Sequence, residues 1–253
     1  MRPIKDMSVL ITGGGSGIGE GTARLFAERG AKVTITGRRK DKIDAVAASI
    51  GPACRAIVGD VTVNEDRQAM LAAAHAHGGK LDVLVNNAAN MYRQAVGEYT
   101  EDFLKEAFNT NVVSAMMLSS MAVPLLEASQ GAIIFLGSIH NRRAYPGASP
   151  YATTKAAVEG LTRVMAAELG RKQIRVACVL PGAVSTEINL RAGLFTAEQS
   201  EARYATVAPD HALGRIGTTL EVAEAIEYLV RAEWVTGVAL EVDGGLGLGV
   251  SNF

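Results

Sequence analysis

The segment Thr12-Gly13-Gly14-Gly15-Ser16-Gly17-Ile18-Gly19 decides the fold of this chain. It follows a short apolar stretch, residues 8–11, and precedes a helical pattern in which Ala23, Phe26 and Ala27 share one side. A strand, a glycine turn and a helix in this order form the start of a βαβ unit. Backbone N–H groups in such a turn, at a helix N-terminus, can hold a pyrophosphate. An isolated glycine string would be weak evidence, but the strand and helix around it strengthen the prediction.

The same alternation of strand and helix continues along the chain. Apolar or β-branched runs predict further strands at residues 32–36, 54–58, 81–85, 132–136, 174–180 and 238–242. Helices are expected at 41–49, 65–76, 101–126 with a kink or end near Pro124, 150–169 and 221–231. Continuous apolar runs are typical of strands buried on both faces. The pattern predicts an α/β fold: one Rossmann-like, doubly wound parallel sheet of about seven strands with helices on both faces, in a single domain, 1–253.

One segment breaks this alternation, between Ser185 and Gly217. It is long and has little strand character, so we expect a loop with one or two helices lying over the carboxyl ends of the strands. Ligands of doubly wound sheets bind at those ends, and long excursions in compact domains are more often functional than not.

Composition excludes several classes of protein. The chain has 253 residues, of which 48% are hydrophobic and 20% charged, and a formal net charge of -1 with scattered signs. Such a chain has no field that would attract nucleic acid or an anionic membrane. Residues 1–6 are polar, and we expect no apolar run long enough to span a bilayer. These features predict a cytoplasmic protein with no nucleic-acid or membrane partner.

Cysteine and histidine residues indicate neither a disulfide framework nor a metal site. Cys54 and Cys178 each lie within an apolar run, as expected of buried thiols in a reducing compartment. His75 and His77 are two residues apart on a predicted helix, and that spacing does not place them on one face. The prediction is therefore that the chain binds no metal.

The glycine spacing is more specific than the turn alone. Glycines at 13, 17 and 19 differ from the usual three-glycine dinucleotide fingerprint, and the segment resembles the T-G-x-x-x-G-x-G motif of short-chain dehydrogenases/reductases. Asp60-Val61 after the third strand is similar to the family's adenine-contacting acid. Asn86-Asn87-Ala88-Ala89 after the fourth strand resembles its Asn-Asn-Ala-Gly motif, with alanine in place of the glycine.

Four further residues match the catalytic positions of that family. Ser138 ends the fifth strand, and Tyr151 and Lys155 lie four apart, on one face of the next helix. Asn111 lies on the central helix, where the family has an asparagine that anchors a water in a proton relay. Taken singly, Asn111 would be a core hydrogen-bonding residue and the Tyr–Lys pair an ordinary helix surface. Their order and spacing together favour catalysis.

The resemblance implies a mechanism. Tyr151 would act as general acid/base on a carbonyl or alcohol oxygen that Ser138 also hydrogen-bonds, and Asn111 would link Lys155 to solvent through water. A tyrosine has an unperturbed pKa of about 10, so we expect the Lys155 cation to lower the pKa of Tyr151. The cofactor would carry the hydride.

The resemblance also implies a nicotinamide dinucleotide and a set of residues that bind it, with Thr186 holding the carboxamide. These residues are Gly13, Ser16, Gly17, Ile18, Gly19, Arg38, Asp60, Val61, Asn87, Ala88, Tyr151, Lys155, Pro181, Gly182, Val184 and Thr186. Relatives that prefer NAD usually place an acid after the second strand, where this chain has Gly37 followed by Arg38. An arginine fork can pair with a 2′-phosphate, so NADP(H) is the predicted preference, with NAD(H) possible. The alternative is that Arg38 and Arg39 are ordinary solvated residues, and Ser16 is not the basic residue that many NADP-dependent relatives carry in the glycine loop.

The predicted function is therefore an NAD(P)-dependent oxidoreductase acting on a small carbonyl or alcohol. The substrate class stays open among ketones, sugars or polyols, steroids and ketoacyl compounds; residues 139–145 and 187–207 are expected to shape the pocket, where His140, Asn141 and Tyr145 could bind a polyol. The family implies a homo-oligomer, tetramer or dimer, with which the long helix from residue 101 and the apolar tail 246–250 agree. The alternatives are an inactive dinucleotide sensor, an isomerase or lyase on the same fold, and a scaffolding protein.

Overall fold

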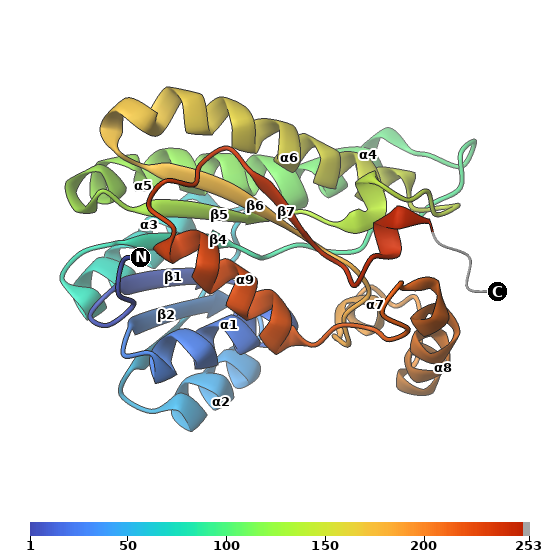
Figure 1. Ribbon diagram of the computed structural model, residues 1–253, viewed down its shortest axis with the longest axis horizontal. Helices are drawn as coiled ribbons and strands as arrows, with labels where there is room; N and C mark the ends of the chain where they lie inside the picture. Colours follow the sequence, from blue (N-terminus) through green and yellow to red (C-terminus); the bar gives the residue numbers. More distant parts are fainter. Residues whose placement is uncertain (250–253) are drawn as a thin grey trace.

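Seven parallel strands form one sheet in the computed structural model, which describes residues 1–249 (Figure 1). Their order is β3-β2-β1-β4-β5-β6-β7, so the chain reverses its direction of travel across the sheet between β1 and β4. A ligand crevice is expected at that switch point, at the carboxyl ends. The doubly wound prediction is confirmed. The strands are β1 Ser8–Thr12, β2 Lys32–Gly37, β3 Cys54–Val58, β4 Val83–Asn86, β5 Ala132–Leu136, β6 Arg175–Pro181 and β7 Ala239–Val242.

Two hydrophobic clusters lie on opposite faces of the sheet. In β1, Val9 and Ile11 point into one cluster and Leu10 into the other, which is why three successive residues of this strand are apolar. The helices α1 Gly17–Glu28, α2 Lys40–Ile50 and α9 Thr219–Arg231 cover the first face. The helices α3 Asn64–Gly78, α5 Ser114–Ser129 and α6 Ser149–Leu169 cover the second (Figure 1).

The long central helix is interrupted at a place other than the predicted one. α4 (Glu101–Phe108) continues through a π-helical turn, Asn109–Val113, into α5. The helix does not end near Pro124, one of the two outcomes expected there, because α5 passes through that residue. Pro124 is exposed, so water can satisfy the carbonyl that a missing N–H leaves without a partner. The irregular turn instead contains Asn111.

This helical stretch also corrects the prediction about apolar runs. Residues Glu101–Ser129 form 29 helical residues whose most apolar window has a mean hydropathy of 1.5, long and apolar enough to cross a membrane by these two criteria. Core helices of soluble proteins meet the same criteria, so one such helix is weak evidence. Here Leu118 and Leu126 are buried against the sheet, whereas Val113, Met116 and Met117 are exposed.

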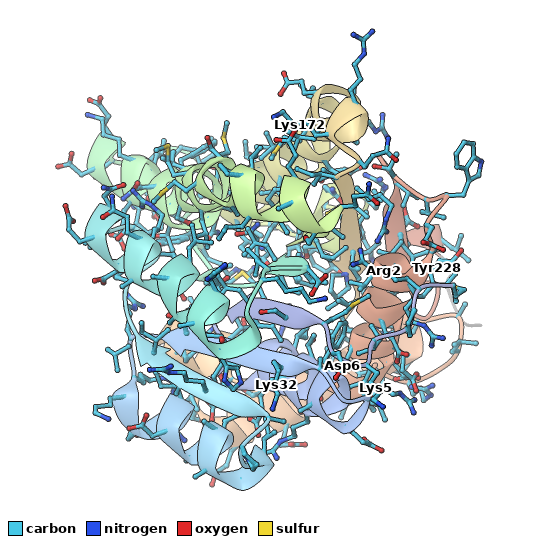
Figure 2. All side chains as sticks on the ribbon, turned by 90° about the vertical axis from the view of Figure 1, so that its left-hand side faces the viewer. Arg2, Lys5, Asp6, Lys32, Lys172 and Tyr228 are labelled. Atoms are coloured by element: carbon cyan, nitrogen blue, oxygen red, sulfur yellow. The ribbon has the colours of Figure 1, made fainter. Side chains whose placement is uncertain are left out.

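The excursion between Ser185 and Gly217 contains two short helices, as expected: α7 (Ile188–Arg191) and α8 (Ala197–Val207), followed by a 3-10 turn, Ala208–Asp210. Both helices lie beyond the carboxyl ends of the strands (Figure 1). The opposite, amino-terminal side of the sheet carries Lys5, Asp6 and Lys32 (Figure 2).

The predicted apolar tail, residues 246–250, is only partly described. Residues Leu246–Leu248 form a 3-10 turn in which Leu246 is buried and Leu248 exposed. Val250 lies outside the described residues.

Candidate active site

Ser138, Tyr151 and Lys155 meet at the carboxyl end of β5. Ser138 lies two residues beyond that strand in an extended conformation, while Tyr151 and Lys155 occupy successive turns at the start of α6. The side chains of Ser138 and Tyr151 are hydrogen-bonded to each other. All three residues are buried and line one cavity.

Burial controls the acid–base properties of the pair on α6. It raises the pKa of Tyr151 to about 12, against a smaller lowering by the hydrogen bond from Ser138. It lowers the pKa of Lys155 to about 8. The Lys155 ammonium lies 5.6 Å from the centre of the Tyr151 ring and donates to the carbonyl of Leu136 at 2.7 Å. The expectation that Lys155 lowers the pKa of Tyr151 is therefore wrong for this structure: Tyr151 keeps its proton at neutral pH, as a proton donor must.

Asn111 is buried but does not line the cavity. Its amide nitrogen donates to the carbonyl of Asn90 at 3.0 Å and to Oγ1 of Thr154 at 3.1 Å, and its oxygen accepts from the backbone N–H of Asn90 at 2.9 Å. These bonds join the loop after β4 to the helix that carries Tyr151 and Lys155. In this geometry Asn111 is a positioning residue.

The glycine segment forms the other end of the cavity. Gly13 has a φ of +68°, and a Cβ there would lie 2.9 Å from Nδ2 of Asn87. That amide donates to the carbonyls of Thr12 and Gly13 at 2.8 and 3.1 Å, so it fixes the turn. Only glycine fits this close approach. The predicted cofactor residues that line the cavity are Gly13, Ser16, Gly17, Ile18, Asn87, Ala88, Tyr151, Lys155, Pro181, Gly182, Val184 and Thr186.

Four other predicted cofactor residues lie outside the lining. Gly19 faces the turn, where a Cβ would lie 2.4 Å from the carbonyl oxygen of Gly13, so its role is to let α1 pack closely. Arg38, Asp60 and Val61 follow the ends of β2 and β3, farther along the same edge of the sheet. The Arg38 guanidinium is 3.7 Å from the Asp60 carboxylate and its side chain is 72% exposed.

The Asp60 carboxylate is held by local hydrogen bonds. It accepts from the backbone N–H and the hydroxyl of Thr62 at 2.9 and 2.7 Å. Burial raises the pKa of Asp60, but these bonds and the charge of Arg38 outweigh it, so the pKa lies below its usual range. Asp60 is therefore an ionised acceptor at neutral pH.

Sequence reasoning missed a cross-link between the glycine turn and the excursion. Arg39 donates to Oγ of Ser16 at 3.1 Å and, through both Nη atoms, to the Glu187 carboxylate at 3.2 Å. Tyr204 on α8 accepts from the N–H of Thr186 and donates to its carbonyl, both at 3.1 Å. Arg39 and Glu187 are 148 residues apart, and no local pattern marks either.

The remaining part of the cavity is contributed by the loops. His140 and Tyr145 line it, with ring centres 4.5 Å apart, and the His140 ring lies 5.2 Å from that of Tyr151. Nδ1 of His140 is 3.0 Å from Oγ of Ser138. Asn141, expected beside them, points elsewhere: its amide donates to the carboxylate of Glu159. The chain segments that bring Met91, Arg93, Arg203 and Leu246 to the same cavity are far apart in sequence.

Comparison with known proteins identifies the family. The family model described as Enoyl-(Acyl carrier protein) reductase matches residues 13–247. The chain is a short-chain dehydrogenase/reductase. Oxidoreductase asL5 of Sarocladium schorii is 34% identical to it over 242 residues, covering 94% of this chain and 95% of that protein. The 3-oxoacyl-(acyl-carrier-protein) reductase FabG of Chlamydia muridarum is 33% identical over 246 residues, covering 94% and 96%.

Solved structures agree with this assignment. A short-chain dehydrogenase/reductase of unknown function from Caenorhabditis elegans, determined with cofactor, has a TM-score of 0.92 and 29% identity, covering 99% of this chain and 98% of that one. The 3-ketoacyl-(acyl-carrier-protein) reductase of Brucella melitensis, complexed with NADH, has a TM-score of 0.86 and 30% identity, covering 96% and 99%. As a member of this family, the chain is an NAD(P)-dependent oxidoreductase that acts on carbonyl or alcohol groups.

Proposed function

We propose that this oxidoreductase reduces the carbonyl of a small molecule with Tyr151 as the proton donor, and runs in reverse as an alcohol dehydrogenase. The observation that carries the proposal is the buried Tyr151 hydroxyl, hydrogen-bonded to Ser138, in the cavity that the glycine turn also lines. The proposal assigns the chemistry to a hydroxyl that keeps its proton until a substrate oxygen takes it.

Each residue of the site has a separate task. Ser138 donates a hydrogen bond to the substrate carbonyl oxygen and holds it beside the Tyr151 hydroxyl. Tyr151 delivers its proton to that oxygen as negative charge develops there, which is general acid catalysis. The Lys155 ammonium stabilises the phenolate that Tyr151 leaves behind, and Asn111 holds α6 in register with the loop after β4. In the direction of oxidation the same groups work in reverse.

The residues present fit a nicotinamide dinucleotide. The turn at Gly13 leaves no room for a Cβ, and Gly17 and Ile18 bring the first N–H groups of α1 to the cavity wall, where a pyrophosphate would bind. Thr186, held by Tyr204, would bind the carboxamide. When bound, the nicotinamide supplies or accepts the hydride.

NADP(H) is the proposed preference. Gly37 ends β2 without a carboxylate that would repel a 2′-phosphate, and Arg38 follows it with an exposed guanidinium. Asp60, 3.7 Å away, is the only acid paired with Arg38 among residues 1–249, and a phosphate dianion can compete with that exposed pair. NAD(H) remains usable in this proposal, since one similar structure was determined with NADH.

The proposed setting is a homo-oligomer, a dimer or tetramer, in the cytoplasm. Exposed apolar side chains on the α4–α5 stretch and on α6, Val113, Met116, Met117 and Val164, support a subunit interface there. Burial of both cysteine residues within 1–249 supports a reducing compartment.

The test is a screen in both directions with NADP(H) and NAD(H). Sugars, polyols, steroids, secondary alcohols, ketones and ketoacyl thioesters are offered, and the nicotinamide absorbance is followed. We expect turnover of one carbonyl class with stoichiometric cofactor oxidation. Substrate conversion without net change in the nicotinamide would instead indicate an isomerase or lyase, and cofactor binding without any turnover would indicate a sensor.

A further inference from the structure

Two arginine side chains line the cavity and lie near enough to His140 for their charges to act on it. Arg93 comes from the loop after β4, and Arg203 from α8. Each is half-buried. One Nη of Arg93 donates to the carbonyl of Pro146 at 2.7 Å, three residues before the start of α6, which fixes this side chain next to the helix that bears Tyr151. The Arg203 guanidinium lies 5.4 Å from the centre of the Phe195 ring.

Within residues 1–249, neither arginine is paired with an acid. Among residues 1–249, Arg93 makes one hydrogen bond, to a neutral carbonyl, and Arg203 makes none. A guanidinium has five N–H donors, so most of the donors of this pair are available to a ligand. Partial burial of two cations without a counter-ion has a desolvation cost, which a bound anion would offset.

The nearby carboxylates are already engaged. Glu187, the one acid in the cavity lining that the structure describes, accepts from Arg39 at 3.2 Å and lies 3.9 Å from Lys42. Asp210 is paired with Arg143 at 3.1 Å. The cavity therefore has an excess of positive charge at its loop end.

The pKa of His140 reflects this excess of positive charge. Its ring stands between Tyr151 and Tyr145, and burial together with the charges of Arg93, Arg203 and Lys155 lowers the pKa of His140 to about 4. Arg203 also lowers the pKa of Arg93, although burial of Arg93 contributes more. Positive charges that disfavour one another in this way would be stabilised by a bound anion.

The cofactor does not account for this pair. The glycine turn and the start of α1, where a pyrophosphate would bind, are bridged to the excursion by Arg39. A third arginine in the cavity lining, Arg191, has a pKa that is affected by the charges of Arg38, Arg39 and Glu187. We therefore assign Arg191 to the cofactor side of the cavity. Arg93 and Arg203 instead neighbour His140.

We propose that Arg93 and Arg203 form an oxyanion site for the substrate, so that the preferred substrate is a short carbonyl compound bearing a carboxylate or phosphate. The inference rests on the proposed reductase function and adds the substrate class to it. His140, neutral and beside Ser138, separates the reacting oxygen from the anion and contacts the carbon chain between them. Charge-assisted, bidentate bonds of this type fix orientation as well as affinity.

The experiment compares pairs of substrates of which one carries an anionic group and the other is neutral. Short oxo carboxylates of several chain lengths are each compared with their methyl esters, and dihydroxyacetone phosphate is compared with dihydroxyacetone, for the wild type and for Arg93→Gln and Arg203→Gln. Arg163→Gln is the matched control, because Arg163 lies on α6 with its side chain 71% exposed and does not line the cavity. The dissociation constant of the cofactor is measured for every variant.

We expect kcat/KM of the wild type to favour the anion in at least one pair by roughly tenfold or more, the scale of a charge-assisted hydrogen bond. Each cavity variant should reduce that ratio by a similar factor, mainly through KM, with cofactor affinity unchanged. The control should keep the ratio. A preference within the oxo carboxylate pairs indicates a site for a carboxylate, and a preference for dihydroxyacetone phosphate over dihydroxyacetone indicates a site for a phosphate.

Two results would overturn the inference while leaving the proposed function intact: turnover with no preference for any anion, or a preference that persists in both cavity variants. If no carbonyl compound is reduced, the proposed function fails, and binding then decides the inference. Thermal unfolding of the enzyme–nicotinamide complex is measured with an oxo carboxylate and with its ester. Stabilisation by the anion alone, lost in Arg93→Gln and Arg203→Gln, supports the site, and its absence refutes it.

Discussion

Replacement of Tyr151 by phenylalanine separates the chemistry of the site from its architecture. The ring of Tyr151 is 6% exposed and its hydroxyl is bonded to Ser138, so Tyr151→Phe removes one oxygen and the transferable proton with little change in volume. General acid catalysis contributes at least about a hundredfold to rate, which corresponds to about 2.7 kcal/mol of activation free energy. We expect kcat for carbonyl reduction to fall by at least that factor.

The fold should change much less than the rate. The lost hydrogen bond contributes about 1 kcal/mol, and the Ser138 hydroxyl still has His140 as a partner at 3.0 Å. For a chain of this size that free energy corresponds to a Tm lower by roughly 2–4 °C. Cofactor affinity, measured by quenching of intrinsic fluorescence, should stay the same within about threefold, since that factor corresponds to less than about 1 kcal/mol.

Tyr228→Phe is the matched control. This variant removes the same hydroxyl from a tyrosine on α9 that is 46% exposed and does not line the cavity (Figure 2). We expect its kcat to equal that of the wild type. If Tyr151→Phe retains more than about a tenth of the wild-type rate, the proton comes from elsewhere and the assignment is wrong.

The rate of reduction by the wild type should also fall as pH rises through about 8. Lys155 then loses the charge that stabilises the phenolate, whereas Tyr151 stays protonated to about pH 12.

Three further predictions concern the cofactor, the thiols and the assembly. Arg38→Ala should lower kcat/KM with NADP(H) by roughly tenfold or more and spare NAD(H); equal losses with both, or a wild-type preference for NAD(H), would contradict the phosphate contact. Activity should survive a chelator and a thiol-blocking reagent, because burial raises the pKa of Cys54 to about 11 and of Cys178 to about 12, and residues 1–249 hold no cluster of metal-binding side chains; loss restored by a divalent ion would reveal a missed site. Deletion of the residues after Gly245 should weaken assembly, measured by light scattering, before it reduces activity; a wild-type monomer at micromolar concentration would refute the oligomer.

The sheet could be predicted because its determinants are local. A strand buried on both faces is apolar along its length, as residues 132–136 are, and a turn with positive φ, as at Gly13, favours glycine. The error at Pro124 has a different origin, because a proline ends a helix only if its surroundings cannot solvate the freed carbonyl, and exposure is a property of the packed molecule.

The acid–base properties of the site could not be predicted in this way. The sequence places Lys155 four residues after Tyr151, and that spacing alone suggests a cation that lowers the pKa of the phenol. In the structure both groups are removed from water, the Lys155 ammonium donates to the carbonyl of Leu136, and desolvation is the largest cause of the pKa shift of each. Burial depends on every segment that covers the cavity, including α8, whose sequence carries no sign of it.

The positions of the residues suggest why one reacting centre can serve different substrates. Ser138, Tyr151 and the turn at Gly13 stand at the ends of strands or at the start of a helix that packs on the sheet, so the two hydrophobic clusters hold them rigidly. Arg93 and Arg203 stand on the loop after β4 and on α8, which contribute no residue to either cluster. A change at Arg93 or Arg203 therefore alters what the cavity attracts without disturbing the hydrogen bond between Ser138 and Tyr151. Separate parts of the chain therefore determine the preferred substrate charge and the proton transfer. For that reason, the variants of the two arginines should change the preference between anionic and neutral carbonyl compounds. The variant of Tyr151 should slow the reduction of both kinds of compound by the same factor.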